Sequence, residues 1–187
     1  MTQAISDAQF RADLADAIPR LRSFARGLCG NRDLADDLAQ EALVKAWAAR
    51  ASYLPGGNFR AWLFTILRNS YYSVSRRASR FTAWDPNLAS HTLVVPADAG
   101  VNIHFEDLER GLGMLPIKQR EALLLVTAQG LSYEEAAAVM DCALGTAKSR
   151  VARARIALME YLEGRGPAAL PAAGAEKLLA AQVLPQL

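Results

Sequence analysis

Residues 131–158 read LSYEEAAAVMDCALGTAKSRVARARIAL, and this stretch decides the fold of the C-terminal part of the chain. Ser132 and Glu135 have the spacing of a capping box, which opens a short helix. The dipeptide Asp141-Cys142 predicts a tight turn, and the apolar periodicity beyond it predicts a longer helix over about Leu144–Leu162. A short helix, a turn of a few residues and a longer basic helix are typical of a helix-turn-helix.

The longer helix of this motif has an apolar face and a basic face. The inward face is predicted to hold Ala147, Val151, Ala154 and Leu158. Side chains opposite or beside it can reach base edges or phosphates, and these are Thr146, Lys148, Ser149, Arg150, Arg153 and Arg155. The alternative is an ordinary bundle helix with a basic outer face. The capping box, the short turn and four basic residues without an acid between positions 148 and 155 favour DNA binding.

The segment before the motif is predicted to form two further helices. Pro116 can open the second of them, whose apolar pattern covers residues 119–129. Gly130 is expected to end that helix. Gly111 and Gly113 lie where helix-forming residues are expected, so the first of the two helices is predicted to fray.

The N-terminal part of the chain is also predicted to be helical. Residues 21–28 carry apolar side chains at the spacing i, i+3, i+4 and i+7. Pro19 is expected either to start that helix or to kink it. Asn31 can cap a second helix over about residues 33–50.

The second helix has two contrasting faces. Its inward face is predicted to hold Leu34, Ala35, Leu38, Ala39, Ala42, Leu43 and Ala46. The opposite face holds Asp37, Gln40, Glu41, Val44 and Trp47. Apolar Val44 and Trp47 among acidic groups indicate a protein-binding surface. The alternative, which this pattern supports equally, is that another helix covers Trp47.

A third helix is predicted from Phe59, with Asn58 as its cap and a wide apolar arc that makes it the central core helix. The residues after it, 69–77, read NSYYSVSRR and interleave tyrosines, hydroxyls and arginines. Arginines contact phosphates, and aromatic faces stack on unpaired bases. The alternative for Tyr71 and Tyr72 is packing against the core.

Composition and charge restrict the class of protein. The chain has 187 residues with 21 Lys or Arg and 19 Asp or Glu, a net charge of +2, but five arginines and no acid lie between positions 60 and 80. Such local basic segments suggest contact with a polyanion. The sequence has only two cysteines, far apart in the chain, which excludes a disulfide scaffold or a cysteine zinc cluster. It shows no apolar run long enough for a membrane helix and no signal peptide, which favours a cytoplasmic protein. His91 and His104 have no metal-binding spacing, so no metal, cofactor or enzymatic site is expected.

The predicted fold is therefore all-α, with two small helical domains at residues 10–80 and 105–163. Residues 81–104 are rich in Pro, Ala, Asp and Asn and are interpreted as a flexible linker. Residues 164–187 are interpreted as a disordered tail, with a short helix around 175–183 as the alternative.

Two motif sets carry a family resemblance. RLRSFARGLCGNRDLADDLAQEALVKAW followed by FRAWLFTILRN resembles region 2 of the extracytoplasmic-function (ECF) group of bacterial sigma factors. LPIKQREALLLVTAQGLSYEEAAAVMDCALGTAKSRVARARIAL resembles their region 4. The likeness covers about residues 10–163, and the YYSVSRR segment is most similar to the general stress response (EcfG-type) sigma factors of alphaproteobacteria. One departure is Asp141, which replaces the usual glycine of the turn and tolerates the left-handed conformation better than most residues.

The resemblance implies roles for individual residues. Region 2 would bind core RNA polymerase through Asp37, Gln40, Glu41, Val44 and Trp47. The FRAWL helix and a following loop would recognise and open the −10 element through Arg60, Trp62, Asn69, Tyr71, Tyr72, Arg76 and Arg77. Region 4 would read the −35 element through Thr146, Lys148, Ser149, Arg150, Arg153 and Arg155. An anti-sigma factor is a further expected partner, and stress-response genes are the expected targets.

Three other functions fit the sequence less well than this one. A sigma-like mimic that sequesters an anti-sigma protein would be expected to lose the arginines of the last helix, which this chain keeps. A stand-alone helix-turn-helix regulator would need neither the FRAWLFTILRN block nor the acidic helix face. An enzyme is disfavoured because the sequence has no carboxylates clustered with a histidine and no phosphate-binding glycine loop.

Overall fold

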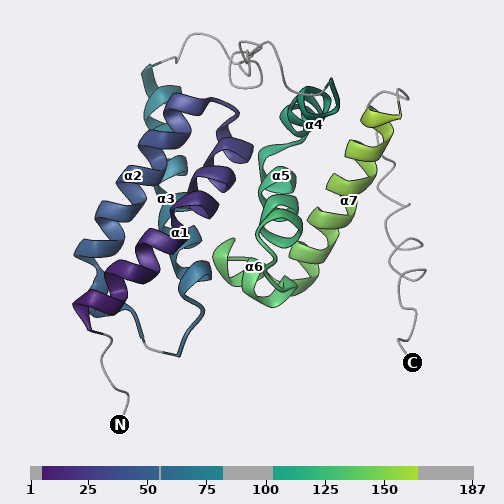
Figure 1. The fold of residues 1–187 in the computed structure, drawn as a ribbon. Helices are drawn as coiled ribbons and strands as arrows, with labels where there is room; N and C mark the ends of the chain where they lie inside the picture. The colour runs from purple at the N-terminus through teal and green to yellow at the C-terminus, as the bar shows by residue number, and fades with distance from the viewer. Residues whose placement is uncertain (1–5, 55, 82–102, 164–187) are drawn as a thin grey trace. The chain divides into compact units, whose positions relative to one another are not determined.

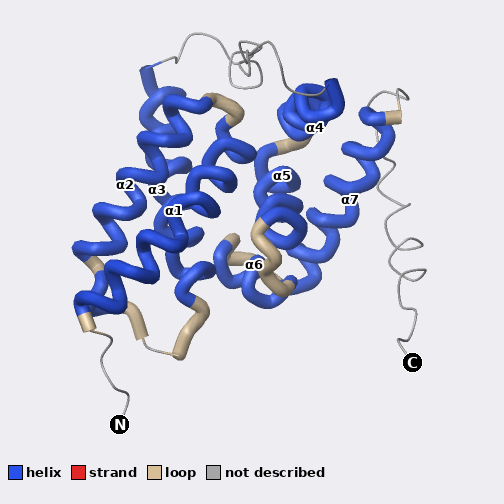
Figure 2. Tube along the Cα trace, viewed as in Figure 1, coloured by secondary structure: helices blue, strands red, loops and turns tan. Residues whose placement is uncertain are grey.

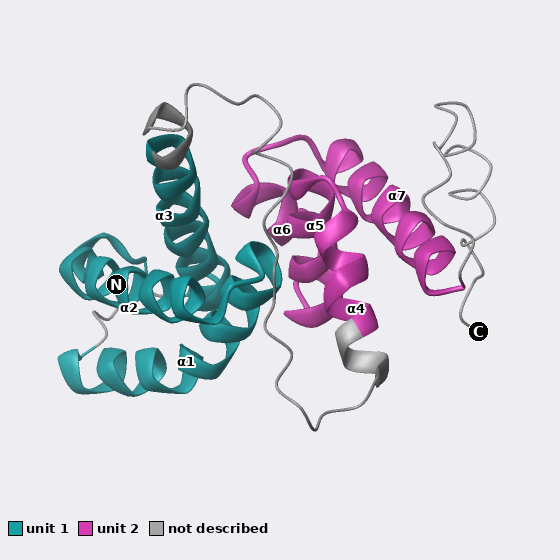
Figure 3. Ribbon diagram, turned by 90° about the horizontal axis from the view of Figure 1, so that it is seen from above, with its two compact units in different colours: residues 1–96 teal, residues 97–187 magenta. Residues whose placement is uncertain are grey.

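The computed structural model describes residues 6–54, 56–81 and 103–163, and every regular element in these ranges is a helix (Figures 1 and 2). The chain divides into two compact units, residues 1–96 and 97–187 (Figure 3). The all-α prediction with two helical units is thus confirmed. Most of the expected linker, the tail at 164–187 and the helix considered at 175–183 lie outside the described residues, as does His91.

Three long helices build unit 1. They are α1 (Asp7–Cys29), α2 (Arg32–Ala48) and α3 (Phe59–Phe81), with a short 3₁₀ helix, η1 (Arg50–Ser52), after α2. Helix α2 packs against both α1 and α3. The rings of Phe24 from α1 and Phe64 from α3 meet edge to face, with centroids 5.1 Å apart. Both rings are buried, so they fix the centre of the bundle.

The starts of these helices follow from local sequence. The Asn31 side chain accepts a hydrogen bond from the Leu34 N–H at 2.9 Å, and Asn58 accepts one from the Ala61 N–H at 3.0 Å. Both predicted caps are therefore confirmed. Pro19, expected to start or kink the first helix, lies inside α1, which begins twelve residues earlier at Asp7.

The segment at 69–77 forms no loop, so the expectation of a loop after the FRAWL helix was wrong. Helix α3 continues without a break to Phe81. Its sequence contains no Gly or Pro that would stop it. The buried face also continues past Leu67 to Ser70, which keeps this part of α3 against the bundle.

The described part of unit 2, residues 103–163, contains four α-helices and a π turn. They are α4 (Ile103–Met114), α5 (Ile117–Leu123), the π turn η3 (Leu124–Ala128), α6 (Tyr133–Val139) and α7 (Leu144–Leu162). Helix α7 packs against the other three helices. The helix predicted at 119–129 starts two residues earlier and ends in the π turn, with Gly130 in the left-handed conformation at φ 69° as expected.

Helix α4 runs through Gly111 and Gly113, against the expectation that these glycines would fray it. A Cβ atom at Gly111 would lie 2.7 Å from Cδ1 of Leu158 and 2.8 Å from Cδ1 of Tyr161. Gly111 therefore lets α4 approach α7 closely. The Arg120 Nη2 group donates to the carbonyl of Gly113 at 2.7 Å, so one of the last carbonyl groups of α4 has a hydrogen-bond partner. Tertiary packing thus outweighs the low helix propensity of glycine.

Candidate nucleic-acid and polymerase interfaces

The helix-turn-helix of unit 2 has its predicted cap and turn. The Ser132 hydroxyl accepts from the Glu135 N–H at 3.1 Å, and the Glu135 carboxylate accepts from the Ser132 N–H at 2.8 Å. Asp141 adopts the left-handed conformation with φ 49°. The Cys142 N–H donates to the carbonyl of Ala137 at 3.1 Å, which closes the turn between α6 and α7. These bonds fix how α7 leaves α6.

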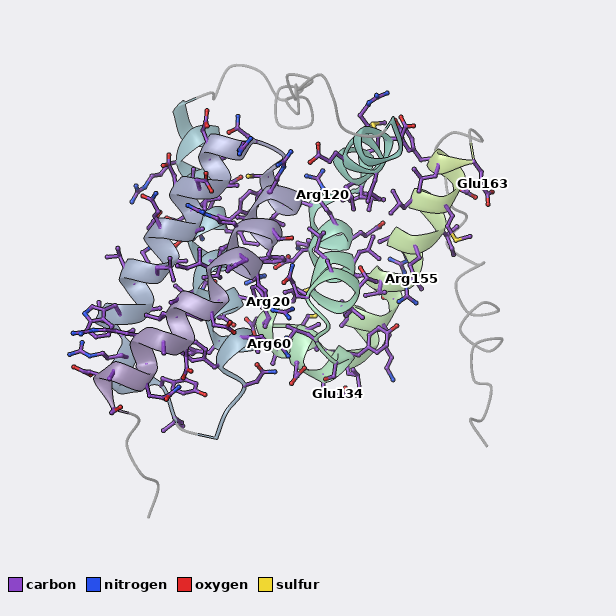
Figure 4. All side chains as sticks on the ribbon, in the orientation of Figure 1. Arg20, Arg60, Arg120, Glu134, Arg155 and Glu163 are labelled. Atoms are coloured by element: carbon purple, nitrogen blue, oxygen red, sulfur yellow. The ribbon has the colours of Figure 1, made fainter. Side chains whose placement is uncertain are left out.

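The faces of α7 are divided as the sequence predicts. Ala147, Val151 and Ala154 are fully buried. Of the predicted DNA-binding set, Lys148 and Arg153 are exposed, and Thr146, Ser149, Arg150 and Arg155 are half-buried. Figure 4 shows these side chains in the context of the fold, with Arg155 labelled on α7 and Glu134 on α6. The six predicted residues therefore all reach the solvent-accessible surface of α7.

Three of these side chains have partners inside unit 2. The Ser149 hydroxyl donates to the carbonyl of Thr146 at 3.0 Å, so it is bonded to its own helix. The Arg150 Nη1 group lies 3.9 Å from the Sδ atom of Met140, which holds this arginine against α6. The Lys148 Nζ atom lies 5.9 Å from the centroid of the Tyr133 ring. Arg153, by contrast, has no ion pair or hydrogen bond within the described part of the chain.

Glu134 in the first turn of α6 is an acidic neighbour of this basic face. A hydrogen bond from its own backbone N–H lowers the pKa of the Glu134 carboxyl, and the Ser132 hydroxyl and the charge of Lys148 lower it further. The carboxylate is therefore ionised and partly offsets the positive potential around Lys148. Sequence analysis did not assign Glu134 to the site, because only the folded turn brings it near Lys148.

The outer face of α2 presents an exposed row of polar and apolar side chains. Asp37, Gln40, Glu41 and Val44 are all exposed, and 69% of the Val44 surface is accessible. An apolar side chain this exposed among acidic groups fits a protein-binding surface.

Trp47 does not belong to that exposed row, because α1 covers it. Its ring lies 6.1 Å from the ring of Phe10, and the guanidinium groups of Arg11 and Arg50 lie 4.9 and 4.6 Å from its centroid. Arg50 also pairs with Asp7 at 3.2 Å. Trp47 is half-buried under α1, as the alternative interpretation expects, and its role as a polymerase contact stays a prediction.

Trp62, predicted as a −10 residue, packs in an aromatic cluster of unit 1. Its ring lies 6.1 Å from Phe10, 5.3 Å from Tyr53 and 5.9 Å from Phe59. Burial raises the pKa of the Tyr53 hydroxyl, and the nearby charge of Asp13 raises it further. The Tyr53 hydroxyl donates to the carbonyl of Gly57 at 2.7 Å, which secures the loop before α3.

The remaining predicted −10 residues lie along α3. Arg60 is half-buried in its first turn, whereas Asn69, Arg76 and Arg77 are exposed near its other end. Nine residues separate Trp62 from Tyr71, or about 14 Å of helix rise. The structure therefore does not bring Arg60 and Trp62 together with the residues at 69–77.

Tyr71 and Tyr72 are half-buried, so each ring has both a packed and an accessible part. Their rings meet edge to face at 5.4 Å, and the guanidinium of Arg68 lies 4.9 Å from the centroid of Tyr72. The Arg76 Nε atom donates to the carbonyl of Tyr72 at 3.2 Å. Aromatic and cationic groups thus adjoin one another on the last turns of α3, the combination that nucleic-acid binding requires.

Among the described residues, none of the His, Cys, Asp and Glu side chains gather in threes as a metal site would require. None of the helices in these residues combines the length and the apolar character needed to cross a membrane.

Comparison with known protein families agrees with the arrangement of the two units. The family Sigma-70 region 2 matches residues 14–81, and the family Sigma-70, region 4 matches residues 105–158. The ECF RNA polymerase sigma factor EcfG of Rhodopseudomonas palustris is 46% identical over 156 residues, which cover 82% of this chain and 86% of EcfG. This chain belongs to the ECF group of the sigma-70 family. The resemblance to EcfG-type sigma factors is thereby confirmed.

Solved structures give the same result for this sigma factor. It is similar to the sigma factor RpoE of Bartonella quintana, crystallised with the anti-sigma factor NepR, at 44% identity and a TM-score of 0.73. That match covers 83% of this chain and 97% of RpoE. CnrH in complex with the cytosolic domain of CnrY matches at 27% identity and a TM-score of 0.64, over 85% of this chain and 90% of CnrH.

Proposed function

We propose that this chain binds core RNA polymerase and directs promoter-specific initiation of transcription, acting as an initiation factor and not as an enzyme. In this proposal residues 10–80 work as region 2 and residues 105–163 as region 4. We place it in the cytoplasm, where polymerase and template meet. The observation that carries the proposal is that one chain combines an exposed acidic and apolar helix face in unit 1 with a capped helix-turn-helix and exposed cations in unit 2.

Helix α7 is the proposed reader of the −35 element. Arg153 is exposed and has no internal partner among the described residues, so its guanidinium can form a bidentate contact with a base edge. Lys148 is likewise exposed, while Thr146 and Ser149 supply shorter polar groups on the same side. Arg150 and Arg155 lie at the flanks and are proposed to hold phosphates.

The outer face of α2 is the proposed polymerase contact, through Asp37, Gln40, Glu41 and Val44. Acidic groups around one exposed apolar side chain suit a basic partner surface with an apolar pocket. Trp47 supports this face indirectly, because it anchors the end of α2 to α1.

The last turns of α3 are the proposed −10 segment, with Asn69, Tyr71, Tyr72, Arg76 and Arg77. Stacking of a flipped base on an aromatic ring offsets about 1–3 kcal/mol of the cost of opening the duplex. Arg60 and Trp62 belong to the other end of α3. Arg60 is proposed to meet DNA there, and Trp62 to hold the helix in place through the aromatic cluster.

An anti-sigma factor is the proposed regulator. RpoE was crystallised with NepR and CnrH with the cytosolic domain of CnrY, and this chain is similar to both sigma factors over more than four-fifths of its length. By analogy with EcfG, stress-response promoters are the proposed targets.

Run-off transcription with purified core polymerase on a promoter library tests the proposal. We expect the full chain to give transcripts from a subset of promoters that share −35 and −10 elements. Core enzyme alone is the control. Binding of the chain to an anti-sigma factor without any promoter-dependent transcript would contradict the proposal and favour the mimic. Duplex binding without core polymerase binding would favour a stand-alone regulator.

A further inference from the structure

Lys45 connects the outer face of α2 to the interior side of α3. It lies on α2 one turn after Glu41, and its Nζ atom pairs with the Glu41 carboxylate at 2.5 Å. The same ammonium group donates to the hydroxyl of Ser70 on α3 at 2.9 Å. One side chain therefore bridges an exposed residue of the proposed polymerase face and a residue of the proposed −10 helix.

The acceptor of this bond is buried. Only 1% of the Ser70 surface is accessible, whereas roughly half of the Lys45 side chain is exposed. A charge-assisted hydrogen bond of this kind is stronger than one between neutral groups and has a defined direction. It therefore links this turn of α3 directly to α2, beside the packing of the two helices.

Ser70 is the direct neighbour of Asn69 and Tyr71 in the chain. A shift of Ser70 would therefore move both side chains, and a small displacement at a site of base capture reduces the rate of the step that depends on it. We propose that Lys45 is a positioning residue that holds the 69–72 turn of α3 in register with the polymerase face, so that promoter opening depends on it although it touches no base. This inference rests on the function proposed above for the two faces.

The sequence alone does not reveal this role of Lys45, because the bond joins two residues that are far apart in the chain. Lys45 reads as a solvated lysine in an i, i+4 pair with Glu41, and such pairs contribute little. The partner that matters is 25 residues further along the chain.

The test uses full-length chains assembled with core polymerase on a promoter that the wild type opens. Lys45→Met keeps the apolar stem and removes the ammonium group, and Ser70→Ala removes the acceptor. Arg32→Met is the matched control, because it removes one positive charge from the same helix at an exposed position. Core affinity, thermal unfolding and the rate at which −10 thymines become reactive to permanganate are measured for each.

We expect Lys45→Met and Ser70→Ala each to slow opening about ten- to a hundredfold, the effect of losing one hydrogen bond to a charged group. Core affinity is expected to stay within about twofold of wild type, and Arg32→Met is expected to open at the wild-type rate. The double variant should be no slower than the slower single variant, because both changes remove the same bond.

Opening at the wild-type rate by Lys45→Met would overturn the proposal, as would a fully additive effect in the double variant. Slowing that merely parallels a loss of core affinity would also overturn it. If Ser70→Ala unfolds unit 1, the surface variant Lys45→Met decides the question. Failure of the wild-type holoenzyme to open any promoter would instead refute the proposed function itself.

Discussion

The cores of the two units differ in the aromatic side chains that they contain. In unit 1, aromatic rings from all three long helices pack together, with Phe10 of α1 against Trp47 of α2 and Phe59 of α3. Alanines and leucines make up most of the buried apolar residues in both units, but among the described residues only unit 1 buries phenylalanines and packs aromatic rings together. A phenylalanine buries more apolar area than an alanine or a leucine, so unit 2 gains less from its core.

The two units also use their cationic side chains differently. Unit 1 uses cations within its own fold: Arg50 pairs with Asp7, Arg22 pairs with Asp36 and Lys45 bonds Ser70. Unit 2 leaves Lys148 and Arg153 exposed on α7. We therefore expect unit 2 to be the less stable of the two units, and a binding partner to stabilise it by mass action.

The largest expected effect is on polymerase binding by unit 1. Asp37→Arg combined with Glu41→Arg is expected to lower core affinity at least about a hundredfold, because the reversed charges repel a basic partner surface. Both side chains are exposed, so the helical fold should persist. Co-purification with core enzyme measures the effect, with Asp16→Arg as a control on an exposed acid of α1. If the double variant co-purifies with core enzyme at the wild-type yield, this face of α2 is not part of the polymerase interface.

A second change tests whether the aromatic cluster stabilises unit 1. Trp47→Ala is expected to lower the free energy of unfolding by about 2–4 kcal/mol, because it removes contacts with Phe10, Arg11 and Arg50. Urea unfolding followed by circular dichroism measures it. Leu54→Ala is the control, since 78% of that side chain is exposed and the change should cost less than about 0.5 kcal/mol. An equally small loss for Trp47→Ala would show that the contacts of Trp47 with Phe10, Arg11 and Arg50 do not stabilise unit 1.

A third change tests the packing of unit 2 alone. Gly111→Val places side-chain atoms against Leu158 and Tyr161 and is expected to destabilise unit 2 by about 1–3 kcal/mol. Trp47 and Trp62 lie in helices of unit 1, and the sequence has no tryptophan between residues 97 and 187, so tryptophan emission does not report directly on the core of unit 2. The variant should therefore lose helical ellipticity earlier while its tryptophan transition stays in place.

Gly145→Ala is the matched control for Gly111→Val. Nothing lies within 4 Å of a Cβ atom at Gly145, so this change should be neutral or slightly stabilising. Equal behaviour of the two glycine variants would contradict the close approach of α4 and α7.

The smallest expected effects separate two arginines of α7. Arg153→Ala is expected to weaken binding to a −35 duplex by about 1–3 kcal/mol and to reduce discrimination between sequences. Arg150→Ala is expected to weaken binding to all duplexes alike and to flatten the salt dependence, as loss of a phosphate contact does. Fluorescence anisotropy on specific and scrambled duplexes measures both. Unchanged selectivity in Arg153→Ala would reject its role in reading bases.

Local signals in the sequence predicted much of this fold. The caps at Asn31, Asn58 and Ser132 and the turn at Asp141 depend only on neighbours within a few residues, and all four were confirmed. The inward face of α7 was predicted from the spacing of its apolar residues, which is also a local signal.

Features that depend on distant residues were left open or missed. The sequence left open whether another helix covers Trp47, because the contact comes from Phe10, 37 positions earlier. The close packing at Gly111 was missed because it depends on Leu158 and Tyr161. The continuation of α3 beyond Asn69 was missed because polar residues there were interpreted as a loop, whereas the buried Ser70 hydroxyl is satisfied by Lys45. The roles of the candidate site residues remain predictions.

The division of work between the two units is tested most directly by one paired measurement on holoenzymes. Closed-complex affinity at low temperature and the rate of −10 permanganate reactivity are measured for Arg153→Ala and Tyr72→Ala. Arg153→Ala is expected to lose closed-complex affinity but to open at the wild-type rate once bound, since duplex reading belongs to α7. Tyr72→Ala is expected to bind normally and to open slowly, since stacking needs an unpaired base. If both variants, still folded, lose affinity and opening rate in equal proportion, the two units do not have separate tasks.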